Sequence, residues 1–186
     1  MNLIIECPNG CKCNLMPSGL IVTEGELNEC SMCGQLVSSC SKTYYEISNQ
    51  IWNTEEGTWP SRNASMRFTK RKTRDINNLA KLLVKNHSNI HILDVGCSNG
   101  SFVSIANSLG LRAEGVDPSE NAITDGFKKG LNLHTGFLDE VAFPDNSFDA
   151  ITLYEVIEHV SDSSSLFKEC ARILRPNGIL LVGTGN

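Results

Sequence analysis

The chain has 186 residues, a formal net charge of -5 and 40% hydrophobic residues, which suffices for one sizeable core and a small additional module. An acidic chain of this kind does not coat nucleic acid or an anionic membrane through bulk charge. No stretch reaches the roughly 18 to 20 apolar residues of a membrane span, and the first residues lack the pattern of a secretion signal. We therefore expect a cytoplasmic protein with no membrane span.

The cysteines gather near the amino terminus, where six of the 8 lie before residue 41. In a reducing compartment such clustered thiols bind a metal ion, by default Zn2+, more often than they form disulfides. Cys30 and Cys33 have the two-residue spacing and the following glycine of a zinc knuckle. For the second pair of ligands, we predict Cys7 and Cys11, with Cys13 as the substitute.

Short apolar runs at 19–23 and 35–37 predict two strands, which would build a ribbon of two small hairpins around the metal. A closed four-sulfur zinc site that only holds this ribbon together is favoured over an iron–sulfur cluster. Cys40 is then an unliganded thiol, because four sulfurs complete the site.

The stretch that follows combines aromatic residues with a basic run, Arg67–Arg74. Such a mixture can bind an anionic ligand, but a helix over 65–85 that keeps its basic residues solvated is the favoured interpretation. Its apolar face would consist of Ile76, Leu79, Ala80, Leu82 and Leu83.

A strand, a glycine turn and a helix come next. Residues 90–95 predict a buried strand that leads into Gly96–Gly100, and residues 112–117 predict a second strand that ends in Asp117. An acid at that position can bind the two hydroxyls of a ribose. Asp94, by contrast, would repel a pyrophosphate and attract an ammonium group, so the pattern favours S-adenosylmethionine over NAD.

These residues also carry a family resemblance. Ile92–Gly100 resembles the first motif of class I S-adenosylmethionine-dependent methyltransferases, and Gly115–Ser119 resembles their ribose-binding second motif. Phe143–Ile151 and Leu174–Val182 resemble the segments that lead into the fourth and fifth strands. The resemblance implies an α/β fold with a doubly wound, Rossmann-like sheet.

The resemblance also divides the chain into domains. A zinc ribbon would occupy residues 1–43, a linker with helical structure 44–74, and the methyltransferase domain 75–186, with five of the seven strands of the family. An apolar fifth strand over 179–182 would then be an exposed sheet edge. We therefore expect a fragment of a longer enzyme.

The cofactor contacts follow by resemblance. One departure concerns Phe137 and Leu138, which stand where the family often has an acid for the adenine amino group; Asp139 is the substitute. The predicted cofactor-binding residues are Asp94, Gly96, Cys97, Ser98, Gly100, Asp117, Pro118, Phe137, Leu138 and Tyr154.

Three polar residues follow the fourth strand. On one helical turn, Glu155, Glu158 and His159 would share a face and could bind a divalent ion such as Mg2+. This pattern resembles ubiquinone-pathway O-methyltransferases and small-RNA 2′-O-methyltransferases. The alternative is that Glu155 caps a helix, Glu158 is solvated and His159 packs below the cofactor. His159 and Glu158 are the candidate catalytic residues, with His159 as the base for a hydroxyl proton.

Three functions are consistent with these features. The first is methyl transfer from S-adenosylmethionine to an oxygen or carbon of a small metabolite or sugar. The second is 2′-O-methylation of RNA. The third is a non-catalytic module whose ribbon docks a protein partner.

Overall fold

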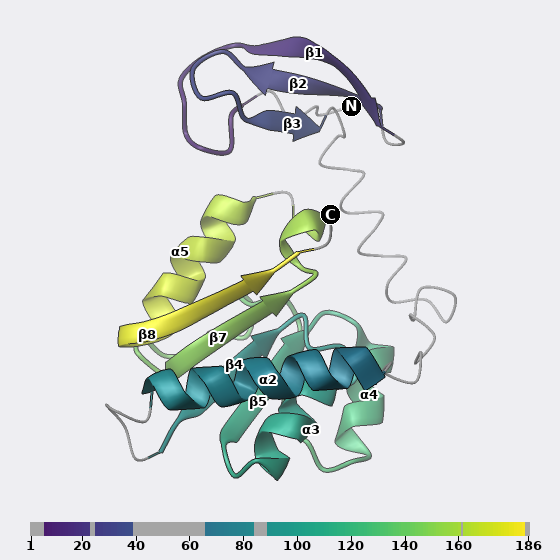
Figure 1. Ribbon diagram of the computed structural model, residues 1–186, viewed down its shortest axis with the longest axis vertical. Helices are drawn as coiled ribbons and strands as arrows, with labels where there is room; N and C mark the ends of the chain where they lie inside the picture. The colour runs from purple at the N-terminus through teal and green to yellow at the C-terminus, as the bar shows by residue number, and fades with distance from the viewer. Residues whose placement is uncertain (1–5, 23–24, 39–65, 84–88, 161, 185–186) are drawn as a thin grey trace.

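The computed structural model describes residues 6–22, 25–38, 66–83, 89–160 and 162–184. Two separate sheets are formed, a small antiparallel one near the amino terminus and a larger parallel one (Figure 1). The predictions for Cys40 and for the stretch 44–65 lie outside the described residues. None of the described helices combines the length and the apolarity that a membrane crossing requires.

The small sheet has the order β1-β2-β3 and consists of β1 (Leu15–Val22), β2 (Gly25–Cys30) and β3 (Leu36–Ser38). β1 and β3 overlap the two predicted strands. The sequence pattern did not predict β2, since Gly-Glu-Leu-Asn-Glu-Cys contains few residues that favour strands. β2 pairs with both neighbours in antiparallel fashion, so two hairpins share this central strand.

The large sheet is parallel throughout and follows the order β6-β5-β4-β7-β8. All five residues of β4 are buried, and six of the seven residues of β7 are buried. Continuous burial is typical of parallel strands that have helices on both faces. The strands are β4 (His91–Val95), β5 (Arg112–Asp117), β6 (Leu133–Thr135), β7 (Phe148–Tyr154) and β8 (Leu174–Gly183).

The helices begin where the local sequence provides caps. The hydroxyl of Ser119 accepts the amide proton of Ala122 at the start of α4 (Glu120–Phe127), and Asp162 accepts from Ser165 at the start of α5 (Ser163–Ile173). These contacts satisfy amide groups that have no partner inside a helix. The other helices are α2 (Met66–Leu83), α3 (Ser101–Ser108) and the short 3-10 helix η1 (Ile157–His159).

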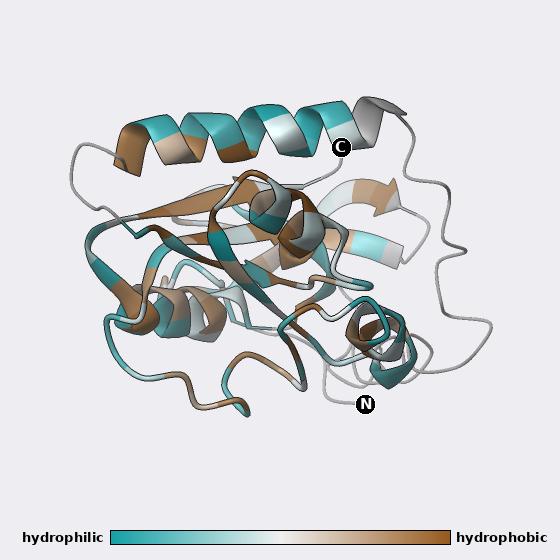
Figure 2. Ribbon diagram, turned by 90° about the horizontal axis from the view of Figure 1, so that it is seen from below, coloured by the Kyte–Doolittle hydropathy of each residue, from teal (hydrophilic) through white to brown (hydrophobic). Residues whose placement is uncertain are grey.

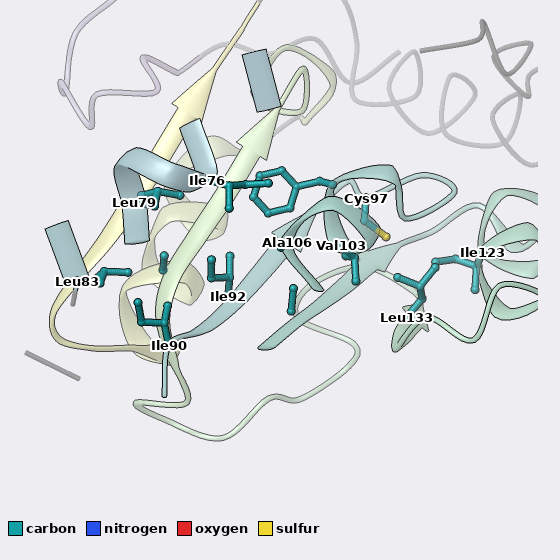
Figure 3. Packing of buried hydrophobic residues seen from close by; sticks show 13 residues of the cluster. Ile76, Leu79, Leu83, Ile90, Ile92, Cys97, Val103, Ala106, Ile123 and Leu133 are labelled. Atoms are coloured by element: carbon teal, nitrogen blue, oxygen red, sulfur yellow. The ribbon is translucent and has the colours of Figure 1, made fainter. Parts of the chain in front are cut away.

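Helix α2 packs with its hydrophobic residues toward the sheet and its hydrophilic residues outward (Figure 2). Ile76, Leu79 and Leu83 are buried against β4 and α3 residues in one core cluster (Figure 3). The prediction for Leu82 is wrong, because its side chain is 62% exposed. The predicted helix over 65–85 is otherwise confirmed to within two residues at each end.

A second core cluster covers the opposite face of the sheet. Cys170 and Ile173 of α5 pack there with Phe148 and Ile151 of β7. Helices therefore cover both faces, as the Rossmann-like prediction requires.

The register of the strands brings three chain positions to one level. Val95 is paired with Val116 of β5 and with Leu153 of β7. The next residues, Gly96, Asp117 and Tyr154, therefore lie side by side at the carboxyl edge of the sheet. The strand order reverses at β4, and open α/β sheets bind their ligands at such a point.

Candidate functional site

The turn after β4 is built for close backbone approach. Gly96 has a φ of +71°, which is the left-handed region, and a Cβ added to it would lie 2.4 Å from Val156 Cγ2. Ser98 also adopts a positive φ, of 51°, although it is not glycine. Such strain in a non-glycine residue persists only where the surroundings hold it, and it is common at ligand sites.

Asp117 holds this turn in place from the neighbouring strand. Its Oδ2 accepts the amide proton of Ser98 at 2.8 Å, and its Oδ1 accepts that of Ser119 at 2.9 Å. Burial raises the pKa of Asp117, against the opposing effect of the two amides. Each carboxylate oxygen has a second lone pair, so the side chain can still accept from two further hydroxyls.

Asp94 lies below the turn and is 2% exposed. Thr152 on β7 donates its hydroxyl proton to Asp94 Oδ1 at 2.6 Å. Burial raises the pKa of Asp94 to about 6, and this rise is opposed by the charge of Lys72 and by the Thr152 hydroxyl. A buried carboxylate with a nearby cation gives this edge a polar centre in an otherwise apolar core.

Lys72 of α2 contributes to the site, although the sequence predicted it on a solvated face; that prediction is wrong. Its side chain is 5% exposed, and its Nζ donates to Ser101 Oγ at 3.1 Å. Nζ also lies 5.8 Å from the centre of the Tyr154 ring. Burial lowers the pKa of Lys72, while the negative charge of Asp94 opposes that effect. The sequence did contain an indication that Lys72 faces inward, since it precedes the apolar Ile76 by one helical turn.

Tyr154 ends β7 at the same edge. Its hydroxyl donates to Asp75 Oδ2 at 3.1 Å, and the Arg71 guanidinium carbon lies 5.5 Å from the centre of its ring. Burial, followed by the charge of Asp75, raises the pKa of Tyr154. Helix α2 is thus attached to the carboxyl edge of the sheet by polar contacts as well as by its apolar face.

The three polar residues after β7 do not share one helical turn, so the helical turn predicted for them is wrong. Glu155 has a φ of 54° and precedes η1, which contains Glu158 and His159. Within the described part of the chain, they do not form a compact group of three ligand atoms such as that of the cysteine sulfurs described below, although Glu155 and His159 both interact with Glu158. Although burial favours the opposite, hydrogen bonds from its own backbone amide and from Thr184 lower the pKa of Glu158.

Comparison with known proteins agrees with the α/β fold described above. The family model described as "Methyltransferase domain" matches residues 93–182. Residues 93–182 are a methyltransferase domain. A curated relative, a ubiquinone biosynthesis O-methyltransferase of Bradyrhizobium diazoefficiens, is 32% identical over 131 residues, which are 67% of this chain and 48% of the relative. The chain thus spans about half the length of that relative.

Solved structures support the fold of the methyltransferase domain. A SAM-dependent methyltransferase of Leishmania major aligns with a TM-score of 0.54 at 16% identity. The alignment covers 75% of this chain and 60% of the Leishmania chain. The [4+2]-cyclase SpnF aligns with a TM-score of 0.50 at 24% identity, covering 59% of this chain and 43% of its own. The predicted class I fold is confirmed, and the second likeness shows that the same fold also occurs in a protein named for another reaction.

The side chains of two predicted cofactor contacts, Cys97 and Leu138, lie in the core of the methyltransferase domain. The Cys97 side chain is buried, and a Cβ on Gly115 would lie 2.6 Å from its sulfur. Leu138 belongs to the second core cluster. Phe137 is 42% exposed, and its amide donates to Glu140 Oε2 at 2.8 Å, so only its ring faces outward near the end of β6.

The remaining predicted contacts are Gly100 and Pro118, with Asp139 as the substitute for the adenine acid. Gly100 has a φ of 74° and caps α3, while Pro118 is half-buried directly after Asp117. Asp139 is exposed.

The ribbon brings together four cysteines from its two ends. The sulfurs of Cys7, Cys11, Cys30 and Cys33 all lie within 4.8 Å of one another. This is the set that the spacing favoured. Four thiolates in one cluster are the donor set of a structural Zn2+ ion.

Cys13 is a fifth thiol beside this cluster, with its sulfur 3.1 Å from that of Cys30. A hydrogen bond from Cys13, followed by the backbone amide of Cys33, lowers the pKa of Cys30 to about 6. Thiolate character of this kind favours metal binding.

Proposed function

We propose that the protein binds S-adenosylmethionine at the carboxyl edge of β4, β5 and β7 and transfers its methyl group to a hydroxyl oxygen of a small molecule. One observation carries the cofactor assignment. The strained turn at Gly96 and Ser98 is held by the carboxylate of Asp117, and this carboxylate keeps lone pairs for a ribose diol.

The residues present fit the cofactor. Gly96 has a left-handed φ, and Val156 fills the space that its side chain would take, so the turn stays compact beside the Asp117 carboxylate. The Asp117 carboxylate suits the two ribose hydroxyls, and the exposed Phe137 ring offers an apolar surface for adenine. When bound, S-adenosylmethionine supplies a methyl group on a positively charged sulfur.

Asp94 and Lys72 suit the amino-acid end of the cofactor. This end carries one ammonium and one carboxylate group, and the site offers a buried carboxylate and a buried ammonium of its own. Opposite charges attract strongly in such a partly dehydrated place. Lys72 would pair with the cofactor carboxylate and Asp94 with its ammonium group.

The acceptor assignment rests on the relatives. The curated relative named above is a ubiquinone biosynthesis O-methyltransferase, which favours oxygen over carbon as the acceptor atom. His159, the last residue of η1 at the carboxyl end of β7, would accept the hydroxyl proton, with Glu158 beside it. Orientation of the hydroxyl toward the methyl group would provide much of the rate enhancement.

The ribbon would hold one Zn2+ ion through Cys7, Cys11, Cys30 and Cys33. The structural role is favoured because four protein sulfurs leave no position open for water or substrate. Metal analysis of the purified protein should find one zinc per chain, and serine at any of the four positions should lower this content.

The cofactor assignment is tested by titrating S-adenosylhomocysteine into the protein by calorimetry. Asp117→Asn should weaken binding by roughly tenfold or more, because it removes a charged acceptor from the diol. Lys72→Met should also weaken it, whereas Lys70→Met, on the exposed side of the same helix, should not. Equal affinity of the Asp117→Asn variant and the parent would contradict the assignment.

The reaction is tested separately. The protein, S-adenosylmethionine with a labelled methyl group and a panel of hydroxylated small molecules should give labelled product, and His159→Ala should reduce it. Cofactor binding without turnover on the panel, but with labelling of RNA or of carbon acceptors, would refute the acceptor class and leave the cofactor site intact.

A further inference from the structure

The ribbon contains more sulfur than a structural metal site can use. Four thiols form the mutually close cluster, and Cys13 remains outside it. Nevertheless, its Sγ lies 3.1 Å from Sγ of Cys30, closer than the 3.6 Å between Cys7 and Cys33 within the cluster. A fifth thiol thus touches a candidate ligand without being needed as one.

The backbone keeps these two sulfurs together. Leu15, two residues after Cys13, is paired with Cys30 in the ladder of β1 and β2. The hydroxyl of Ser31 donates to the carbonyl oxygen of Asn14 at 3.3 Å, which links the same two segments a second time. A disulfide has a sulfur–sulfur distance of about 2.05 Å, so a shift of roughly 1 Å would suffice to form one.

The two thiols differ in access. Cys30 is buried at 1% exposure, whereas Cys13 is half-exposed. A small oxidant from solvent therefore reaches Cys13 before Cys30. Accessible thiols that lie next to a second, resolving thiol are common oxidation sites; Cys33 is more exposed, but as a zinc ligand its sulfur would be bound to the ion.

On this basis, and resting on the Zn2+ site proposed above, we propose that Cys13 is an oxidation site through which a hydroperoxide expels the zinc ion. Hydrogen peroxide oxidises the Cys13 thiol to a sulfenic acid; its O–O bond breaks and water leaves. The Cys30 thiolate attacks this sulfur, which forms the Cys13–Cys30 disulfide and releases hydroxide.

The oxidation balances in electrons, and the loss of one ligand explains why the metal ion leaves. Two sulfurs lose two electrons in total, and the peroxide accepts both. Cys30 is no longer a thiolate, so three ligand sulfurs remain for an ion that requires four. Zn2+ leaves, and the ribbon loses the metal that closes it.

The experiment uses the zinc-loaded full chain, treated with hydrogen peroxide in the presence of a chromogenic zinc chelator. The parent should release its zinc, and peptide mapping should find Cys13 joined to Cys30. Cys13→Ser should keep one zinc and release it more slowly by roughly tenfold or more. Cys170→Ala, which removes a buried thiol of the methyltransferase domain, is the control and should behave as the parent does.

Three results would overturn the proposal: release from Cys13→Ser at the parent rate, a disulfide between other cysteines, or loss of zinc from untreated Cys13→Ser. The last would make Cys13 a ligand. A parent that holds no zinc at all would refute the zinc site itself, and mapping of the peroxide-treated chain would still decide whether Cys13 and Cys30 join.

Discussion

Three glycines allow the backbone strain at the turn after β4 to be separated from its steric crowding. Gly110 has a φ of +80° and nothing within 4 Å of an added Cβ, so Gly110→Ala introduces strain alone. Gly115 is free of positive φ, but its added Cβ would lie 2.6 Å from Cys97 Sγ, so Gly115→Ala introduces crowding alone. Gly96→Ala combines a φ of +71° with a contact of 2.4 Å to Val156.

The expected costs follow from these contacts. A left-handed alanine costs about 1–2 kcal/mol, and overpacking costs about 1–3 kcal/mol. Gly96→Ala should therefore lower the free energy of unfolding by about 2–5 kcal/mol. Alanine also restricts the unfolded chain, which offsets about 0.4–1 kcal/mol in each variant and cancels when the variants are compared.

The measurement is urea unfolding followed by the helical circular dichroism signal, which in the described part of the chain comes from α2 and from the helices of the methyltransferase domain. Gly96→Ala should be the least stable of the three and should also lose affinity for S-adenosylhomocysteine. Gly110→Ala should keep that affinity, because Gly110 follows the far end of α3. A Gly96→Ala variant no less stable than Gly110→Ala would refute the close approach of Val156.

Three further outcomes are expected. Hydrogen bonds and charge from the neighbouring histidines lower the pKa of Glu114 from 4.5, against the effect of burial. The folded state then binds fewer protons than the unfolded chain, so the free energy of unfolding should fall as pH falls through and below 4.5. In acid titrations Glu114→Gln should flatten this decline, and the exposed Glu26→Gln should not. Thr152→Val should cost about 1–3 kcal/mol in urea unfolding, because Asp94 loses a buried donor, whereas Thr152→Ser should cost less. A zinc chelator should abolish the ribbon's chemical-shift dispersion in NMR spectra and leave the helical circular dichroism signal unchanged. Loss of both signals would contradict the expectation that the methyltransferase domain stays folded without the zinc-bound ribbon.

The strands of the methyltransferase domain were predictable because burial on both faces leaves a simple signature. Arg112–Asp117 was predicted with its observed bounds, and β4 was predicted to within one residue. The glycine turn and Asp117 were also found, since backbone approach and an acid at a strand end place strict demands on residue type.

Other features depend on contacts between distant segments. The basic run around Lys72 looked solvated as a whole, and only the docking of α2 decides which of its residues turns inward. Glu155 was predicted to begin a helical turn, but its amide donates to the carbonyl oxygen of Gly183 at 2.8 Å, which holds it in a left-handed conformation. β2 forms because it pairs with both β1 and β3. The composition of β2 alone does not indicate this pairing.

Because Gly96, Asp117 and Tyr154 lie at the same level of three adjacent strands, the sheet itself fixes the spacing between them. Adjacent strands lie about 4.8 Å apart, so the three positions span roughly 10 Å. This interval depends on backbone pairing and not on the side chains. Under the proposed function, substitutions in the loops would change which acceptor fits without altering this interval. Cofactor affinity and acceptor preference would then change independently of each other.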